Sequence, residues 1–285
     1  MAGASTVLDA TVIRSEFPVV TSEINGKPLV YLDSANTSQK PNIVIDTMAN
    51  FMRESYAPIN RSAYTLAANA TELYEGSRVA VAKFINANNP REIVFTKNAT
   101  EALNLIAYSW GRANLQRGDV VLLTHMEHHA NIVPWQMLQQ ERGIELRWVP
   151  LTSDFQLDLS SLPTLLKDVK VFSFTAMSHA AGAIAIVDAC QSVPHSPTDV
   201  QALGADFAMF SSHKMCGPSG LGVLWGREAL LEAMPPFMGG GNMISEVRLD
   251  GFKCAELPAK FEAGTPAIVE VVGLGAAVEF LNGVG

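Results

Sequence analysis

Lys214 and Asp188 are the two residues whose types and positions point most directly to chemistry. Lys214 ends the segment FSSHK and stands just before a Pro/Gly turn, and a lysine amine can form a Schiff base with a carbonyl group. Asp188 closes the apolar run AIAIVD, which predicts a buried strand with one carboxylate at its C-terminal end. A carboxylate there can pair with a pyridinium nitrogen. Together the two residues supply what an enzyme needs to hold pyridoxal phosphate.

Each of these parts also has an interpretation without chemistry. A Ser-His-Lys segment alone is usually a polar strand end, and a strand-end aspartate such as Asp188 often caps the next helix. The combination favours a ligand, because a hydroxyl, an imidazole and a lysine directly precede a turn. The glycines at positions 217, 220 and 222 let the backbone bend sharply close to a bound molecule.

Six segments together resemble a known family. They are YLDSANTSQKP, MEHHANIVPWQ, VDACQSVPHSPTDVQALGADF, FSSHKMCGPSGLGVLW, PPFMGGGNMI and FEAGTP. From about Phe17 to Leu281 the chain resembles the SufS-type, group II cysteine desulfurases, which are related to selenocysteine lyase. MEHHANIVPWQ is specific for this group, whereas many fold-type I enzymes share the lysine motif.

The resemblance implies an α/β fold, the large domain of a fold-type I, class V aminotransferase-like enzyme with pyridoxal 5'-phosphate as cofactor. Such an enzyme converts L-cysteine to L-alanine and passes the sulfur on as a persulfide, for iron-sulfur cluster or sulfur-cofactor assembly. The implied partners are L-cysteine or L-selenocysteine, a second copy in a homodimer, and a sulfur-acceptor protein.

The resemblance also implies roles for residues around the cofactor ring. Lys214 carries the cofactor and, with His128, handles protons, while His128 stacks on the ring. Asp188 pairs with the ring nitrogen and Gln191 bonds to the phenolic oxygen. Arg61 matches a substrate-binding loop arginine, although the residue before it is asparagine here, where the family has histidine.

The segment KNAT, residues 97–100, is the predicted phosphate site. It lies between a predicted strand and a predicted helix, and such a turn offers free backbone N–H groups and the positive end of the helix dipole to an anion. Thr100 is also an adequate helix N-cap, which would explain the segment without a ligand. The resemblance implies that the phosphate is contacted by Ala99, Thr100, Ser211 and His213, and by Thr265 of the neighbouring subunit.

The segment HMEHHAN, residues 125–131, offers a competing metal interpretation, because three histidines and a glutamate are plausible zinc ligands. Its spacing matches neither HExxH nor HxxEH. We therefore expect no metal site. The resemblance implies instead that His129 and Asn131 shape the loop around His128.

Two departures from the family accompany the match. After the strand predicted at residues 169–174, Ser178 is followed directly by His179. The resemblance implies a loop and a helix at this point, and the sequence lacks them. A crossover between parallel strands needs about a dozen residues. The family also continues into a small domain with the catalytic cysteine, and none of Cys190, Cys216 and Cys254 matches that nucleophile. We expect that the chain is truncated and lacks this C-terminal domain. Two alternatives stay open: a catalytically inactive cofactor-binding or dimerisation remnant, and another fold-type I lyase that uses no cysteine.

Composition narrows the class of protein. The formal net charge of −8 argues against nucleic acid or an anionic membrane as a partner. The three irregularly spaced cysteines form neither a metal pattern nor a disulfide framework, which suits a reducing compartment. With no transmembrane run and no export signal in the sequence, we expect a cytoplasmic protein.

The hydrophobic pattern predicts alternating helices and strands. Helices are predicted at residues 42–56, 70–86 and 101–111, and strands at residues 92–96, 120–124, 145–151, 169–174, 183–188, 207–211 and 222–226. Continuous apolar strands separated by helices imply a mostly parallel sheet covered by helices on both faces. We expect an N-terminal arm over residues 1–30 and a cofactor-binding large domain over residues 31–285.

Overall fold

The computed structural model describes residues 8–60, 62–175 and 183–285. The chain divides into two compact units, which are described separately. The first unit comprises residues up to 84 together with 212–220 and 267–285, and the second comprises residues 85–211 and 221–266. The arm expected at residues 1–30 falls within the first unit, and its boundary stays a prediction.

The second unit is built around a seven-stranded sheet among the described residues. The strands are β3 (Ile93–Thr96), β4 (Val120–Thr124), β5 (Glu145–Val149), β6 (Val169–Thr175), β7 (Ile184–Asp188), β8 (Phe207–Ser211) and β9 (Gly222–Gly226). Their order is β3-β9-β8-β7-β6-β4-β5. Only β9, of the strands described in this sheet, runs against the others, since it pairs antiparallel with both β3 and β8. The mostly parallel sheet of the predicted α/β fold is confirmed.

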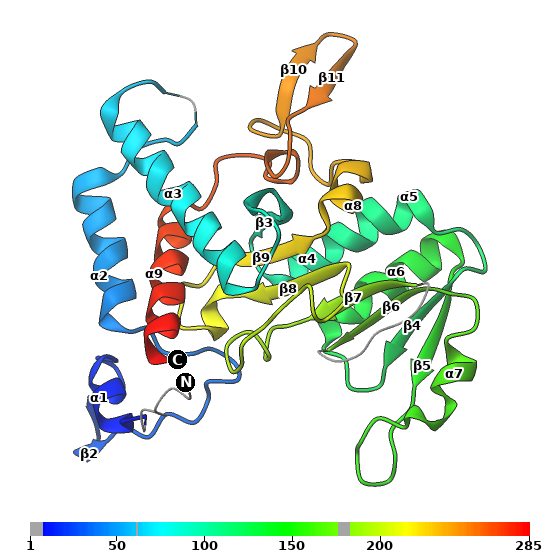
Figure 1. Ribbon diagram of the computed structural model, residues 1–285, viewed down its shortest axis with the longest axis horizontal. Helices are drawn as coiled ribbons and strands as arrows, with labels where there is room; N and C mark the ends of the chain where they lie inside the picture. The colour runs from blue at the N-terminus through cyan, green and yellow to red at the C-terminus, as the bar shows by residue number, and fades with distance from the viewer. Residues whose placement is uncertain (1–7, 61, 176–182) are drawn as a thin grey trace, which may run out of the picture. The chain divides into compact units, whose positions relative to one another are not determined.

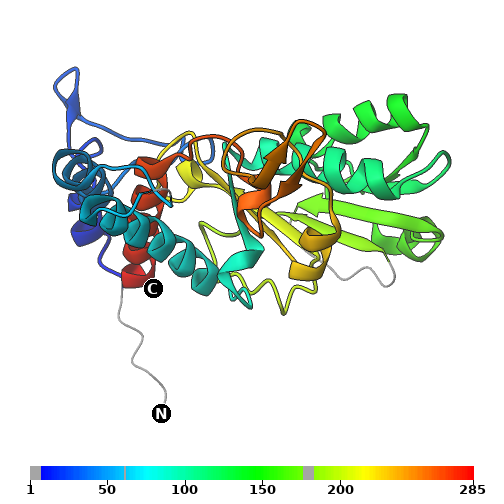
Figure 2. The ribbon, with the colours of Figure 1, turned by 90° about the horizontal axis from the view of Figure 1, so that it is seen from above.

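One face of this sheet packs against a continuous helical segment and a second helix. The segment consists of α4 (Ala99–Leu105), η3 (Ile106–Gly111) and α5 (Arg112–Asn114), and the second helix is α6 (Val133–Arg142) (Figures 1 and 2). Val121 and Ile186 from the strands pack with Trp135 of α6 in one apolar cluster. The helix predicted at 101–111 is thus confirmed, and it begins two residues earlier.

Strand alternation turns other side chains of β6 to the opposite face. Phe172 and Phe174 line a groove of about 600 Å³ there with Leu159 and Leu162, which belong to η5 (Leu159–Ser161) and α7 (Leu162–Leu165). β6 and β7 pair in parallel, with Thr175 opposite Asp188. The short crossover noted in the sequence falls on residues 176–182, which lie outside the described residues.

The first unit is mainly helical. It contains α1 (Ala10–Ser15), α2 (Asn42–Asn50), η1 (Phe51–Ser55), α3 (Thr65–Phe84), η6 (Ser212–Lys214) and α9 (Ile268–Val284), and the hairpin of β1 (Glu23–Ile24) with β2 (Lys27–Pro28). Both α2 and α3 pack against α9 (Figure 1). A Cβ at Gly275 of α9 would lie 2.4 Å from the Ser77 hydroxyl of α3, so these helices cross closely. The helices predicted at 42–56 and 70–86 are confirmed, the first as α2 followed by η1.

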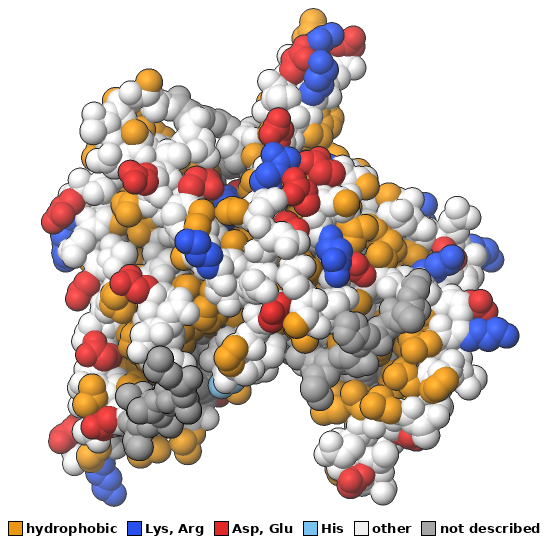
Figure 3. All heavy atoms as spheres, in the orientation of Figure 1, with side chains coloured by type: hydrophobic (Ala, Val, Ile, Leu, Met, Phe, Trp, Pro, Cys, Tyr) orange, Lys and Arg blue, Asp and Glu red, His pale blue; other side chains and the backbone are white. Residues whose placement is uncertain are grey.

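A two-stranded hairpin also belongs to the second unit. β10 (Ile244–Arg248) and β11 (Gly251–Cys254) form the hairpin. Charged side chains of both signs gather on it in Figure 3, and Glu246 forms ion pairs with Arg248 and Lys253. The hairpin also exposes Val247, Leu249 and Phe252, so charged and apolar side chains both face solvent there.

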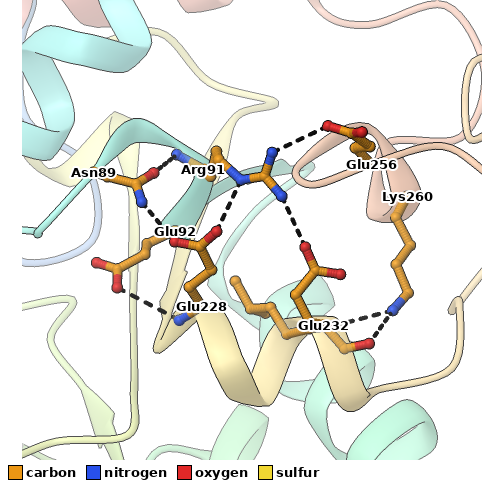
Figure 4. Close-up of polar contacts among 8 residues, drawn as sticks. Asn89, Arg91, Glu92, Glu228, Glu232, Glu256 and Lys260 are labelled. Carbon is orange, nitrogen blue, oxygen red and sulfur yellow. Dashed lines mark hydrogen bonds and ion pairs between the residues drawn. The ribbon is translucent and has the colours of Figure 1, made fainter.

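Arg91 ties together the segments at the base of this hairpin. It is the middle residue of η2 (Pro90–Glu92), and its guanidinium contacts three carboxylates, those of Glu228, Glu232 and Glu256, at 2.8–3.1 Å (Figure 4). The buried Lys260 of η7 (Ala259–Phe261) donates to two carbonyls at the end of α8 (Glu228–Ala233). These contacts hold η7 and α8 together just before the predicted phosphate residue Thr265.

Candidate cofactor site

Asp188 lies buried at the C-terminal end of β7, as the sequence predicts, and is 4% exposed. Its Oδ1 accepts a hydrogen bond of 3.0 Å from the Cys190 N–H. Among the described residues no helix begins within residues 189–206, so the helix-capping alternative is wrong and the aspartate closes a turn instead. A buried carboxylate needs donors or a cationic partner, which suits a pyridinium N–H.

The β3–α4 turn is organised by Asn98. Its side chain accepts a hydrogen bond of 2.9 Å from the Glu101 N–H and caps α4. The N-cap is therefore Asn98 and not Thr100, which is exposed in the first turn. The buried Ala99 donates its N–H to the Ser211 hydroxyl at 3.0 Å, so two predicted phosphate residues are in direct contact.

Gly222 of β9 passes directly beneath this turn. A Cβ on it would lie 2.4 Å from the Asn98 carbonyl carbon and 2.9 Å from the Ala99 nitrogen. The neighbouring atoms are backbone, which cannot move aside without displacing the turn. Gly222 thus allows the strand and the predicted phosphate turn to approach each other.

We expect Gly222→Ala to destabilise the fold by about 1–3 kcal/mol, because a methyl group there overpacks the backbone. It should also weaken binding of pyridoxal phosphate, since the turn must shift. Urea unfolding and a cofactor titration measure the two effects. Gly251→Ala is the matched control, because a Cβ at Gly251 meets no atom within 4 Å. Equal behaviour of both variants would show that the turn tolerates displacement.

His128 is exposed and stands at the start of η4 (His129–Asn131). Its Nδ1 accepts a hydrogen bond of 3.1 Å from the Ala130 N–H. Because a backbone N–H can only donate, the neutral ring carries its proton on Nε2. The proton that His128 can exchange with a ligand is therefore at Nε2.

The parallel strands bring most of the predicted site to one edge. β3, β4, β7 and β8 run in the same direction, so their C-terminal ends share one edge of the sheet. Ligands of open α/β sheets bind at this edge. The predicted residues that follow these strand ends in the second unit are Ala99, Thr100, His128, Asp188, Gln191 and Ser211. Gln191 is exposed there.

Thr265 lies in an exposed loop after η7. The loop is fastened to the sheet by Glu262, whose carboxylate accepts a hydrogen bond of 2.7 Å from the Phe95 N–H of β3. A second contact joins the Gly264 N–H to the Gly241 carbonyl at 2.8 Å. The loop is therefore held in place while the Thr265 side chain is free to meet solvent or another molecule.

The Lys214 turn belongs to the first unit. Lys214 and His213 are half-buried in η6. The His213 carbonyl accepts hydrogen bonds from Thr37, from both the N–H and the hydroxyl of Ser38, and from the Lys40 ammonium, at 2.9–3.2 Å. This clamp fixes the peptide that precedes Lys214. The sequence segment SANTSQK carried the signal, but no role could be assigned to it without the structure.

Burial lowers the pKa of His213, and the charges of Lys214 and Lys40 lower it further. Burial likewise lowers the pKa of Lys40, while Cys216 opposes that change. The imidazole of His213 is therefore biased toward its neutral form, in which one ring nitrogen can still accept a proton or a hydrogen bond.

Cys216 occupies a left-handed backbone position, with φ of 64°, in the same turn. Its N–H donates to the Ser38 hydroxyl at 2.7 Å, and burial raises the pKa of its thiol, against the opposing effect of Lys40. Cys190 and Cys254 are half-buried. A reactive cysteine needs a stabilised thiolate, and the raised pKa of the Cys216 thiol disfavours that form.

Arg61, the predicted substrate residue, lies outside the described residues. Asn60 before it has a φ of 61° and donates its N–H to the Thr71 hydroxyl at 3.1 Å.

In the part of the chain that the structure describes, no helix is both long and apolar enough to cross a bilayer.

Comparison with known proteins relates most of the chain to one family. The model of the class V aminotransferase family matches residues 30–285. A probable cysteine desulfurase from Synechocystis sp. is 50% identical, over 97% of this chain and 70% of the relative. A cysteine desulfurase from Serratia proteamaculans is 49% identical, over 96% of this chain and 72% of the relative.

Solved structures give the same picture. A cysteine desulfurase from Thermococcus onnurineus NA1 superposes with a TM-score of 0.91 at 35% identity, over 98% of this chain and 72% of that structure. The cysteine desulfurase CsdA from Escherichia coli superposes with a TM-score of 0.87 at 38% identity, over 97% of this chain and 72% of that structure. The fold expected from the sequence is the fold of these enzymes.

Proposed function

The chain belongs to the class V aminotransferase family, and from this membership we propose that it is a pyridoxal 5'-phosphate-dependent cysteine desulfurase of the SufS-like group. The reaction converts L-cysteine to L-alanine and leaves the sulfur as a persulfide on a cysteine thiol, to which the family resemblance matches none of Cys190, Cys216 and Cys254. The observation that carries the proposal is the buried Asp188 carboxylate. It lies at the same sheet edge as the β3–α4 turn, whose backbone N–H group bonds to the Ser211 hydroxyl.

The residues present fit the cofactor by their chemistry. A buried carboxylate suits a pyridinium nitrogen, and a hydroxyl beside a helix start suits a phosphate. Gly222 provides the close backbone approach that keeps this turn tight. When bound, pyridoxal phosphate supplies an electron sink for the substrate carbanion.

The chain's own residues then have distinct tasks. Asp188 holds the proton of the ring nitrogen. Lys214 would hold the cofactor through its Nζ amine, and the same amine would exchange the substrate Cα proton. His128 exchanges a proton at Nε2, because its Nδ1 is engaged with the Ala130 N–H. Ser211 and the β3–α4 turn, with Ala99 and Thr100, hold the phosphate.

Further assignments follow from the family resemblance and extend the proposal. His213 joins Ser211 at the phosphate, Gln191 binds the phenolic oxygen, and Arg61 binds the substrate. The Thr265 loop reaches the phosphate of a second subunit, which makes the protein a homodimer with shared sites. A sulfur-acceptor protein takes the persulfide sulfur, in the cytoplasm, and L-selenocysteine is the alternative substrate.

Proton removal at Cα is the step that tests this function in the 285-residue chain, because it does not need the sulfur nucleophile. We expect the protein loaded with pyridoxal phosphate to exchange the Cα hydrogen of L-alanine for deuterium in D₂O, followed by proton NMR. We expect no sulfide from L-cysteine, since none of Cys190, Cys216 and Cys254 matches the nucleophile of the family. The triple Cys→Ala variant is the control and should exchange normally.

The alternatives give different results in the same assay. Production of pyruvate with sulfide from L-cysteine would indicate a lyase that uses no cysteine. Cofactor binding with no exchange of the alanine Cα hydrogen would indicate an inactive remnant.

A further inference from the structure

Glu127 precedes His128 and is buried, with 8% of its surface exposed. Its Oε1 accepts hydrogen bonds from the Thr124 hydroxyl at 2.6 Å and the Thr175 N–H at 3.1 Å. Its Oε2 accepts from the Asn131 amide at 2.7 Å and the Thr175 hydroxyl at 3.0 Å. The carboxylate thus joins the ends of β4 and β6 to the loop that carries His128.

Asn131 extends this network and sets its direction. The residue is fully buried, and its Oδ1 accepts hydrogen bonds from the Trp135 indole N–H, at 3.3 Å, and from the Ser173 hydroxyl. An indole N–H can only donate. The oxygen of Asn131 must therefore face Trp135, and its NH₂ group must face Glu127.

This direction explains why position 127 needs a carboxylate. The Thr175 N–H meets Oε1 and the Asn131 NH₂ meets Oε2, and both groups are obligate donors in this arrangement. Both atoms at the end of side chain 127 must then be acceptors. A glutamine of the same shape would place its own NH₂ against one of the two donors, and a buried donor left unpaired is costly.

His128 is held between the two members of this network. The Asn131 N–H donates to the His128 carbonyl at 2.8 Å, and the Ala130 N–H donates to Nδ1. The ring itself is exposed, while Glu127 and Asn131 beneath it are buried. The backbone turn that supplies the Ala130 N–H is therefore set by the buried pair.

We propose that Glu127 and Asn131 are positioning residues that orient the His128 imidazole and keep its proton on Nε2. The role in cofactor binding rests on the function proposed above, whereas the orientation and tautomer of the ring are properties of the protein alone. The sequence showed Glu127 only as a possible zinc ligand. The structure assigns its oxygens to hydrogen bonds instead.

The direction of the network gives a sharp test. Glu127→Gln and Asn131→Asp each break it. In Glu127→Gln the new NH₂ group faces another N–H donor, that of Asn131 or of Thr175. In Asn131→Asp the new carboxylate faces the carboxylate of Glu127. The double variant Glu127→Gln/Asn131→Asp restores it, because the glutamine NH₂ then donates to the new carboxylate. That carboxylate still accepts from Trp135. The double variant keeps the net charge of the wild type.

Two measurements are made on each variant. The ¹⁵N NMR signals of the His128 ring in the cofactor-free protein, assigned by their loss in His128→Asn, report the tautomer. A titration gives the dissociation constant for pyridoxal phosphate. In each single variant we expect the ¹⁵N signals of His128 to show a mixture of the two ring tautomers instead of the Nε2–H tautomer alone. We also expect each single variant to bind the cofactor about tenfold more weakly. The double variant should return to within about twofold of the wild type.

Glu92→Gln is the matched control. Glu92 is 4% exposed, and its carboxylate also accepts hydrogen bonds from an indole N–H, that of Trp225, at 2.9 Å, and from the Asn88 N–H. It accepts a further hydrogen bond from the Glu228 N–H (Figure 4). We expect this variant to lose thermal stability while the His128 signals stay unchanged. Unchanged His128 signals in Glu127→Gln, or altered signals that the double variant does not restore, would overturn the proposal. Failure of the wild type to bind pyridoxal phosphate would instead refute the proposed function.

Discussion

Lys214→Ala abolishes the visible absorption band that pyridoxal phosphate acquires when a lysine binds it as an imine. The amine at this position is the proposed covalent partner of the cofactor. Its turn is held by the Thr37, Ser38 and Lys40 contacts to the His213 carbonyl, so the amine starts from a fixed backbone. An absorption spectrum of purified protein mixed with excess cofactor, before and after borohydride reduction, measures the effect.

Lys40 supplies the control for this assignment. It is a second, half-buried amine that contacts the same carbonyl, at 3.2 Å, and burial lowers its pKa, which favours a nucleophilic free amine. We expect Lys40→Met to retain the band. A band that survives in Lys214→Ala and disappears in Lys40→Met would assign the covalent attachment to Lys40 instead.

Asp188→Asn is expected to weaken binding of pyridoxal phosphate by about 10- to 150-fold, the equivalent of a charge-assisted hydrogen bond worth about 1.5–3 kcal/mol. Asparagine has the same shape, and its oxygen can still accept the Cys190 N–H that Asp188 accepts at 3.0 Å. The substitution therefore removes the charge and leaves the turn. Exchange of the alanine Cα hydrogen should be lost as well, because the ring nitrogen is no longer held protonated.

Asp188→Ala separates charge from structure, since it removes the turn acceptor too. Thermal unfolding of the cofactor-free protein should show Asp188→Ala less stable than Asp188→Asn. If Asp188→Asn binds the cofactor with the affinity of the wild type, the carboxylate has a purely structural role.

Most strands of the sheet were predictable because they are buried on both sides. Their apolar runs are continuous, as in β4 and β8, where every residue is buried, and a run of that kind is typical of a parallel sheet. The direction of β9 was not predictable, since its residues read like those of its neighbours. The helix α9 was also missed, because its apolar residues are spread around the helix and are interrupted by glycines, which leaves no periodic pattern to detect.

The candidate site divides in the same way. The positions of Asp188 and the β3–α4 turn could be predicted because they lie at strand ends, and the ends of parallel strands meet at one edge, whereas Ser211 was named from the family resemblance. The cap at Asn98 could not be predicted, since Thr100 and Asn98 are both acceptable caps. The hydrogen-bond network of Glu127 could not be predicted either. Only the hydrogen-bond partners of Glu127 distinguish a buried positioning residue from a metal ligand.

The antiparallel strand β9 also sets the time at which the β3–α4 turn, the predicted phosphate site, can form. Among the described strands of its sheet, β3 pairs only with β9, and β3 ends at Thr96 whereas β9 begins at Gly222. A nascent chain that grows at ~5–20 residues per second has no partner for β3 until about 6–25 s after β3 is made. During synthesis β3 and the start of α4 must wait as an unpaired edge, and the turn that they form is completed only when the ribosome has passed Gly226.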